Sequence, residues 1–456
     1  MKNNVYLLDC KLYEYNKEVF KVSDYYEELY KNNLEIASDR CVYNKVRDLL
    51  IEMKLDSENI GKKNWNPFGD FIKEGNIVLI KPNLVKHINE SLTGNVDSLI
   101  TNFSIIRPII DYSILALGNT GKIVIGDSPV QECNFDEVIK INDLSESIRK
   151  YKSIFFDITL IDFRKNNNLL LKCKLVRIDE NSSFCNIDSK NIEYAITNYN
   201  LKMMKLHHIN GKHEYIIPEI VLKSDVILNL SKPKTHRKAG MTACMKNFVG
   251  INGNKECLPH HRTGSVKNNG DEFPENNIIK KIESYFKKFT YKKNKIINFI
   301  RLPLLLILKI EKKLQYQEGS WYGNDTIWRT ILDLNKLILY ADKSGTLRKK
   351  PQRVIFNLAD MIISGEGDGP LLPTNKKVGY LVASFNQLNT DYVICKIMGF
   401  NPEKIKYISN GYKLKKFKIS NNKVFQVIDN TGKLKKIEKY ICRFVPSNGW
   451  KDQIEE

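Results

Sequence analysis

Four short runs of apolar, mostly β-branched residues are spaced along the middle of the chain. They cover residues 76–80, 122–125, 225–230 and 353–358. None alternates between apolar and polar positions, which is typical of strands buried on both faces of a parallel sheet. The stretch Phe103–Leu117 separates the first two runs and is expected to be their crossover helix. The pattern predicts an α/β fold with mostly parallel sheet and flanking helices.

A polar cluster follows each of the four runs. These clusters are Lys81–Asn83, Gly126–Pro129, Ser231–His236, and Asp360 with Gly365–Pro370. In open α/β sheets, ligands bind beyond the carboxyl ends of the strands, where the following loops meet. The sequence therefore predicts a functional site at this edge of the sheet.

The segments outside this region are expected to be additions to it. Residues 1–70 are polar, with helical stretches at Asp24–Asn33 and Tyr43–Met53, and are interpreted as an N-terminal elaboration. Residues 71–412 hold the α/β region. Residues 413–456 are rich in lysine and β-like, which indicates a small C-terminal appendage.

An insertion at about residues 275–320 interrupts the α/β pattern. Lysines flank the apolar stretch 296–308, which is too short, and too broken by Arg301 and Pro303, to span a bilayer. Two interpretations stay open. The segment lies in the interface of a membrane with its lysines on anionic lipid, or it is a buried helical hairpin with solvated basic ends.

Composition and charge narrow the class of protein. With 42% hydrophobic and 27% charged residues among 456, the chain is globular rather than disordered. A net charge of +20 favours an anionic partner, unless it reflects lysines spread evenly over the surface. No zinc finger, aromatic RNA-binding strand or helix-turn-helix is recognisable, so sequence-specific nucleic-acid binding is not expected.

The nine cysteines bear on cofactor and compartment. No two are closer than twelve residues, so the C-x-x-C pairs of zinc sites and iron–sulfur clusters are missing and no iron–sulfur cluster is expected. An odd number without a framework argues against a secreted disulfide protein, and the first ten residues have too short an apolar stretch for a signal peptide. We expect a cytoplasmic protein, with a peripheral position at the inner face of the membrane as the alternative.

Histidines concentrate in one part of the chain. Six of the seven fall between residues 207 and 261; His207, His208 and His213 are interpreted as peripheral, and the group of interest is His236, His260 and His261. Lysines surround this group, and lysines packed closely lower each other's pKa unless an anion compensates. The favoured interpretation is an anion-binding or catalytic centre in which His236, Lys246 and His260 carry the chemistry. A basic exposed loop is the alternative.

The residues expected to bind an anionic substrate come from several strand ends and from segments after residue 260. They are Lys81, Asn83, Asp127, Ser128, Lys232, Lys234, Thr235, Asn247, His261, Arg262 and Arg329. A helix over Gly240–Phe248 would point the amides of its first turn at this anion. Trp321–Arg329 is polar and aromatic, which suits a sugar-stacking face or an anion clamp as well as core packing.

Three carboxylates are candidate ligands for a divalent metal. Asp360, Glu366 and Asp391 could together hold Mg²⁺ or another hard ion through oxygen atoms. The glycines of Gly365–Gly369 could cradle phosphate, although a plain tight turn explains them equally well.

The ordered motifs resemble a known family. Lys81-Pro-Asn83, Gly126-Asp127-Ser128, Lys232-Pro-Lys-Thr-His236 with Lys246-Asn247, Asp360 with Gly-x-Gly-x-Gly-Pro370, and Asp391 before Asn401-Pro are similar to the bacterial and archaeal family called domain of unknown function 362, over roughly residues 70–412. Many members carry an appended ferredoxin-like module with C-x-x-C repeats, which this chain lacks. The blocks His260–Ser265, Gly270–Pro274 and Trp321–Arg329 resemble a subgroup associated with surface-polysaccharide gene clusters.

A second likeness concerns the order of His236, Lys246 and His260. It is similar to the order of catalytic residues in nickel-pincer lactate racemases. That resemblance implies two α/β lobes around a cleft, with a metal or a nucleotide-derived cofactor.

These observations predict an enzyme that acts on a phosphorylated or carboxylated sugar or a lipid-linked saccharide, with or without a divalent metal, in surface-polysaccharide biosynthesis. A non-catalytic protein bound to a membrane surface, or to nucleic acid without sequence preference, is the alternative.

Overall fold

A computed structural model describes most of the chain. It covers residues 3–15, 26, 28–29, 41–118, 120–153, 157–187, 192–197, 199–209, 211–275, 277–287, 295–310, 316, 318–421, 423–433 and 437–456. The helix expected at Asp24–Asn33 lies almost entirely outside the described residues.

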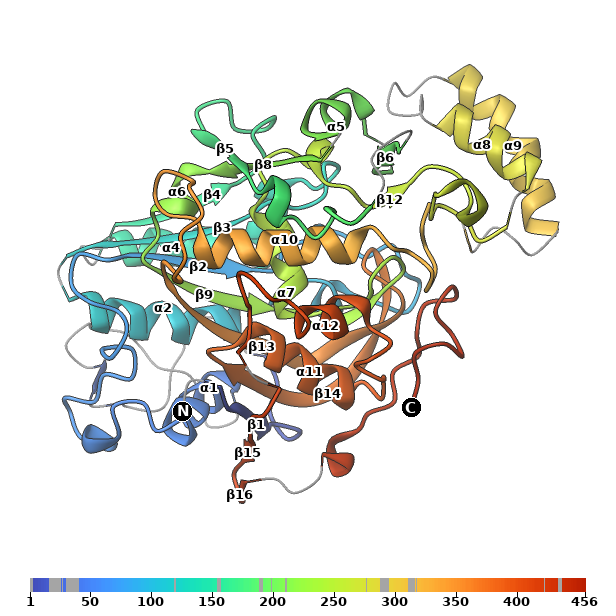
Figure 1. Ribbon diagram of the computed structural model, residues 1–456. Helices are drawn as coiled ribbons and strands as arrows, with labels where there is room; N and C mark the ends of the chain where they lie inside the picture. The colour runs from blue at the N-terminus through green and yellow to red at the C-terminus, as the bar shows by residue number, and fades with distance from the viewer. Residues whose placement is uncertain are drawn as a thin grey trace.

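Five parallel strands form one side of a large sheet, with β4 at its edge (Figure 1). In spatial order they are β4 (Ile158–Asp162), β3 (Lys122–Asp127), β2 (Ile77–Pro82), β9 (Val226–Ser231) and β13 (Val354–Asp368), each hydrogen-bonded in parallel to the next. All four apolar runs are therefore strands, and the predicted α/β class with a mostly parallel sheet is confirmed.

Both ends of the chain contribute to the same sheet. Antiparallel β14 (Leu372–Ser384) follows β13, and β1 (Val5–Asp9) pairs with β14. Beyond it lie β15 (Val427–Asp429), parallel to β1, and β16 (Gly432–Lys433). The segments expected as an N-terminal elaboration and a C-terminal appendage thus supply strands at one side of a continuous sheet.

β13 is much longer than its apolar run. It continues through the glycine-rich stretch, where Gly365 pairs with Asn375 and Gly367 pairs with Pro373 of β14. A Cβ added to Gly369 would lie only 2.1 Å from the carbonyl oxygen of Thr235. Neither the phosphate-cradling loop nor the plain tight turn expected at Gly365–Gly369 is observed, because this stretch is mostly a paired strand whose glycines permit close approach of neighbouring segments.

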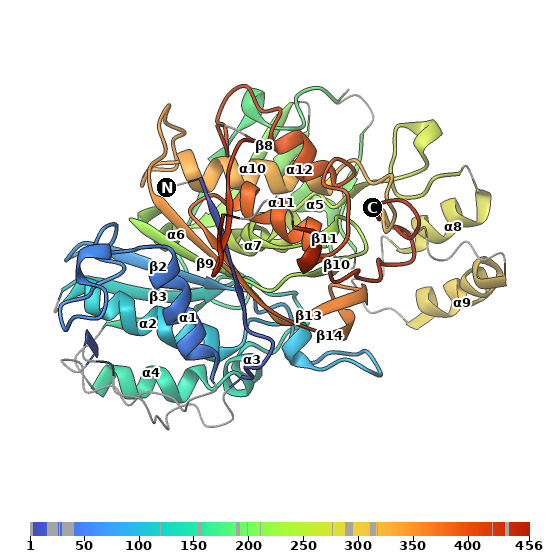
Figure 2. The ribbon, with the colours of Figure 1, turned by 90° about the horizontal axis from the view of Figure 1, so that it is seen from below.

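Helices cover both faces of the sheet, and the strand residues alternate between two cores. Val78 and Ile80 pack on one side, whereas Leu79 packs on the other. The first core contains α1 (Val42–Glu52), α2 (Phe103–Leu117), α3 (Phe135–Ile141) and α4 (Leu144–Ser153). The second contains α7 (Cys244–Asn247), α10 (Ile327–Tyr340), α11 (Gln387–Ile397) and α12 (Lys406–Gly411). Figures 1 and 2 show the resulting three layers.

The predicted helices Phe103–Leu117 and Tyr43–Met53 correspond to α2 and α1. Pro108 lies in the second turn of α2. The Asn102 side chain caps that helix by accepting from the Ser104 amide.

Smaller elements lie beyond the carboxyl ends of the parallel strands or beside them. They are β5 (Cys173–Arg177), β6 (Tyr194–Ala195), α5 (Leu201–His207), β7 (His208–Ile209), β8 (Lys212–Pro218), α6 (Glu219–Lys223), β10 (Lys234–His236), β11 (Gly240–Thr242) and β12 (His261–Arg262). Single 3₁₀ turns cover Ser57–Asn59, Val96–Ser98, Asp179–Asn181, Phe248–Ile251, Lys255–Cys257, Val266–Asn268 and Glu438–Tyr440.

The insertion forms two helices that extend from one end of the molecule (Figures 1 and 2). They are α8 (Ile278–Lys287) and α9 (Lys295–Ile310), which pack against each other. Within the described ranges, no helix combines the length and apolarity needed to cross a bilayer.

The C-terminal segment closes the second core over β10 and β11. Trp450 is buried, and its indole nitrogen donates to the carbonyl oxygen of Arg237 at 2.5 Å. Its ring lies so close to Gly240 that a Cβ there would approach it to 3.0 Å. The tail therefore belongs to the packed core next to His236.

We expect Trp450→Ala to lower the free energy of unfolding by about 3–5 kcal/mol, because it leaves a large cavity and an unsatisfied carbonyl. Urea denaturation measures this change. Lys451→Ala, at an exposed neighbouring position, should change the stability by less than about 0.5 kcal/mol. Equal effects of the two substitutions would contradict a packed tail.

Candidate active site

A cavity of about 430 Å³ lies at the carboxyl ends of β2 and β3, a size that suits a small-molecule ligand. Its walls come from the loops after these strands, from β10 to α7, from the segment around residues 255–260, and from Ile196, Thr197 and Tyr199. The predicted site residues that line it are Asn83, Asp127, Ser128, His236, Lys246, Asn247 and His260. The predicted catalytic trio is thus brought together.

Several lining residues have no counterpart in the predicted set. Lys238 and Lys255 contribute ammonium groups, and Thr197, Tyr199 and Glu318 are also part of the wall. Lys238 belongs to the basic run that starts at Lys232, so the sequence contains a pattern that could have identified it as a site residue. The other lining residues come from irregular segments, where no pattern of apolar or charged positions indicates a site.

The two cavity histidines are held as opposite tautomers when neutral. Nδ1 of His236 accepts from the backbone amides of Lys238 at 3.0 Å and Ala239 at 3.2 Å, so its proton is on Nε2. Nδ1 of His260 is 2.7 Å from the carbonyl oxygen of Leu258 and must donate to it, which leaves Nε2 with a free lone pair. His236 therefore offers a donor, and His260 an acceptor.

Burial keeps both imidazoles neutral. It lowers the pKa of His236 well below its usual value, and the neighbouring Lys246 lowers it further. Burial also lowers the pKa of His260 strongly, assisted by Lys238. Neutral rings beside ammonium groups are suited to proton transfer and hydrogen bonding near neutral pH.

Three lysines make the cavity electropositive. The pKa of Lys246 is lowered to about 8, and the pKa values of Lys238 and Lys255 are lowered to about 7. Burial is the largest cause in each case. In the described part of the chain, none of the three is within ion-pair distance of a carboxylate, and Lys238 donates instead to the Thr197 hydroxyl at 3.0 Å. An anionic ligand would supply the missing negative charge.

Two buried hydroxyl groups in the cavity wall can form hydrogen bonds with a ligand. The side chains of Ser128 and Thr242 line the cavity and are almost completely buried. Neither hydroxyl oxygen has a hydrogen-bond partner among the residues described. Since buried polar groups are normally paired, these two are suited to a hydroxyl or oxyanion of the ligand.

An ion pair lies under the cavity. Nζ of Lys81 is 2.7 Å from Asp127 Oδ1, and the Leu84 amide donates to Asp127 Oδ2 at 2.6 Å. A Cβ at Gly250 would lie 2.1 Å from Asp127 Oδ1 and 2.8 Å from Lys81 Nζ, so only glycine fits there. Lys81 is fully buried and does not line the cavity.

Lys232 and Lys234 also lie beneath the surface rather than in the cavity. Nζ of Lys232 donates to Asp360 Oδ2 and to the Tyr15 hydroxyl, each at 2.7 Å. Nζ of Lys234 donates to Asn83 Oδ1 at 2.6 Å, and burial lowers its pKa strongly. Lys81, Lys232 and Lys234, expected to hold the substrate anion, are placed as internal supports because strand-end carboxylates and amides already bind them.

Thr235 and Asn247 have similar supporting positions. The Thr235 hydroxyl donates to the carbonyl oxygen of Gly367 at 2.7 Å. Asn247 reaches the cavity wall, but its amide also donates to the carbonyl oxygen of Lys81 at 3.0 Å. These contacts join β10 and α7 to the sheet.

The helix expected over Gly240–Phe248 is shorter than predicted. Its first three residues form β11, and α7 is only one turn long. The amides of Cys244 and Met245 donate to the carboxylate of Asp391, at 2.7 and 3.1 Å. The expected substrate anion at this helix start is therefore replaced by an internal carboxylate, whose pKa burial raises to about 7.

The structure does not bring the three predicted metal ligands together. Asp360 binds Lys232, Glu366 binds Lys376 at 2.8 Å, and Asp391 caps α7. Among the described residues, no group of three or more His, Cys, Asp or Glu side chains is arranged to hold a metal.

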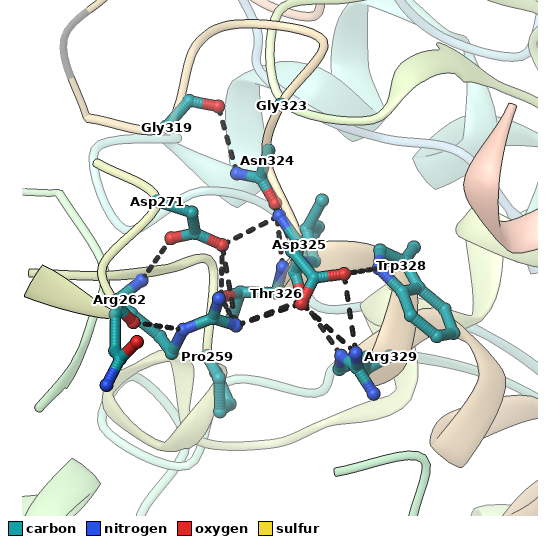
Figure 3. A network of polar contacts seen from close by, with 12 residues as sticks. Pro259, Arg262, Asp271, Gly319, Gly323, Asn324, Asp325, Thr326, Trp328 and Arg329 are labelled. Carbon is teal, nitrogen blue, oxygen red and sulfur yellow. Dashed lines mark hydrogen bonds and ion pairs between the residues drawn. The ribbon is translucent and has the colours of Figure 1, made fainter. Parts of the chain in front are cut away.

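Arg262 and Arg329 belong to a separate polar network (Figure 3). Asp325 Oδ2 is 3.3 Å from Arg262 Nη1 and 3.1 Å from Arg329 Nη2. Asp271 accepts from the Asp325 amide at 2.7 Å. Neither arginine lines the cavity, because internal carboxylates already bind both. His261, which belongs to β12, lines a different and smaller hollow. This network joins the two ends of the insertion.

The site thus defines an α/β protein with a basic, histidine-bearing cavity at the strand ends. A family model described as "Domain of unknown function (DUF362)" matches residues 187–396, which include His236, Lys246, His260, Asp360 and Asp391. The resemblance noted from the ordered motifs is confirmed for this part of the chain. No curated protein matches the sequence.

Among solved structures, the lactate racemase apoprotein from Thermoanaerobacterium thermosaccharolyticum is similar at 11% sequence identity and a TM-score of 0.32. The match covers 76% of this chain and 55% of that one, so the chain spans about half the length of the racemase structure. A likeness of this size does not bear on activity.

The tautomer assignment is open to direct measurement. In protein with ¹⁵N-labelled histidine, long-range ¹H–¹⁵N spectra should show His236 protonated at Nε2 and His260 at Nδ1, with neither charged at pH 6. His236→Gln and His260→Gln assign the signals. The same tautomer at both rings, or imidazolium at pH 6, would contradict the geometry.

Proposed function

We propose that the protein is an enzyme that binds an anionic small molecule in this cavity and transfers protons with His260 and Lys246. The observation that carries the proposal is the meeting of two neutral histidines of opposite tautomer with three ammonium groups that have no carboxylate partner among the residues the structure describes. A merely structural basic cluster would be expected to pair its charges internally, as Lys81 and Lys232 do.

The arrangement supports distinct roles for the three catalytic candidates. The lone pair on His260 Nε2 would accept a proton from the substrate. The Lys246 ammonium, with a pKa of about 8, would supply a proton to another atom and be restored by transfer from the imidazolium. His236 would stay neutral and polarise a substrate oxygen through its Nε2–H.

The substrate class follows from the remaining groups on the cavity wall. Lys238 and Lys255 would bind a phosphate or carboxylate, and the hydroxyls of Ser128 and Thr242 would bind hydroxyl groups. A phosphorylated or carboxylated sugar, free or lipid-linked, carries both kinds of group. Such a substrate agrees with a place in surface-polysaccharide synthesis.

Anion binding should weaken as the pH rises. The lysines must be protonated to bind an anion, and their pKa values in the free cavity are about 7 to 8. Sulfate keeps its charge over this range, so its affinity, measured by calorimetry, should be highest below pH 7 and fall as the pH rises through 7 and 8.

Lys246→Gln and Lys255→Gln should each weaken sulfate binding by about tenfold or more. Lys451→Gln, on the exposed tail, serves as the matched control and should bind as the wild type does. Binding that is independent of pH and of both cavity lysines would reject the site.

Proton transfer can be tested directly by isotope exchange, which does not require the product to be identified. The wild-type protein is incubated in D₂O with a panel of sugar phosphates and uronic acids, and deuterium incorporation is followed by NMR. His260→Gln should slow incorporation by about 100-fold or more. His207→Gln, whose ring binds Glu214 away from the cavity, should have no effect.

Incorporation by His260→Gln at the wild-type rate would remove the assigned base. The absence of any exchange by the wild type across the panel would reject proton abstraction from these two substrate classes.

A further inference from the structure

The α8–α9 hairpin encloses an ion pair and leaves apolar side chains exposed on its outer side. On α9, Arg301 faces α8, where its Nε donates to Glu283 Oε1 at 3.0 Å, and Leu308 is fully buried. Glu283 is itself buried. In a helix on the surface of a soluble protein the exposed side is normally polar, whereas the exposed side of α9 is largely apolar.

The exposed side of α9 is a continuous apolar stripe. Its members recur at intervals of three and four residues, as the side chains on one face of a helix do. They are Ile296, Phe299, Ile300, Pro303, Leu306, Ile307 and Ile310. Phe299 is 76% exposed and Ile310 is 73% exposed. On α8, Ile278, Ile282 and Tyr285 form a shorter stripe with the same spacing.

Exposed apolar surface of this extent indicates a partner. Single exposed leucines such as Leu169 and Leu170 occur elsewhere on the protein and need no explanation. The hairpin differs because its exposed residues are contiguous and because it extends away from the sheet (Figure 2).

The charge of the hairpin indicates the chemistry of that partner. Residues 278–310 contain nine basic residues and a single acid, Glu283, which Arg301 neutralises. Lys281 and Lys309 are exposed on the helices themselves. A mixed apolar and cationic surface fits the interface of a bilayer that contains anionic lipids, where lysines contact phosphate groups and the apolar side chains enter the acyl boundary.

The helix lengths agree with a position in the plane of the interface. α9 has sixteen residues, which gives about 24 Å, less than the roughly 30 Å of a hydrocarbon core. Outside the hairpin, the network of Arg262, Asp271 and Asp325 joins the segments that precede and follow the insertion.

We propose that the α8–α9 hairpin docks the protein on the surface of a membrane containing anionic lipids. This inference is independent of the chemistry in the cavity. It assigns the apolar stripe to the lipid and the lysines to the headgroups.

The test is co-sedimentation of the full-length protein with phosphatidylcholine vesicles, with and without phosphatidylglycerol. The wild type should bind the anionic vesicles at low salt, and less at high salt, because screening weakens the lysine contacts. Replacement of Phe299, Leu306 and Ile310 together by serine should reduce this binding by about tenfold or more.

The matched control replaces Leu92, Leu169 and Leu170 by serine, since these side chains are even more exposed but lie outside the hairpin. The control should bind vesicles as the wild type does. Both triple variants should keep the wild-type affinity for sulfate, which separates failure of docking from failure of the cavity site.

Three results would overturn the proposal. The first is equal vesicle binding by the stripe variant and the wild type, and the second is no binding by the wild type at low salt. The third is a wild-type dimer that the stripe variant converts to a monomer without any vesicle binding, which would assign the stripe to a second copy of the chain.

Discussion

The structure depends on the need to pair ammonium groups buried at the carboxyl ends of the parallel strands. Lys81 and Lys232 are fully buried, and leaving either unpaired would cost several kcal/mol. Asp127 and Asp360 pair with them, from neighbouring strands of the same sheet. These bonds fix the loops that follow β2, β3 and β9 relative to one another. Lys238, Lys246 and Lys255, in the cavity above this layer, have no carboxylate partner in the described part of the chain and remain for a ligand.

The difference between the paired lysines beneath the cavity and the lysines in its wall explains which parts of the site the sequence could predict. The apolar runs identified four of the five parallel strands but not β4, and the rule that ligands bind at the carboxyl ends located the cavity. Proximity in sequence could not separate supporting lysines from ligand-binding ones. Lys232 and Lys246 belong to one basic run, yet only Lys232 meets a carboxylate, and that carboxylate is 128 residues away in the chain. The pairing depends on tertiary structure that no local pattern encodes.

The same limit applies to the ends of the chain and to the glycine-rich stretch. β1 and β15 are short, and their place in the sheet depends on pairing across more than 400 residues. Gly365–Gly369 has the composition of a loop, but its pairing with β14 makes most of it a strand. By contrast, α2 was predicted to the residue because its apolar pattern and its Asn102 cap are local.

Two hydrogen bonds connect the cavity wall to the segment that follows the hairpin. The chain returns from the insertion through Glu318, whose carboxylate accepts from the Thr197 hydroxyl at 2.7 Å. That hydroxyl in turn accepts from Lys238 at 3.0 Å, and all three residues line the cavity. A displacement of Glu318 on docking would therefore alter the position of a lysine proposed to bind the substrate anion. If docking changes anion affinity in this way, linkage requires anion binding to change membrane affinity by the same factor.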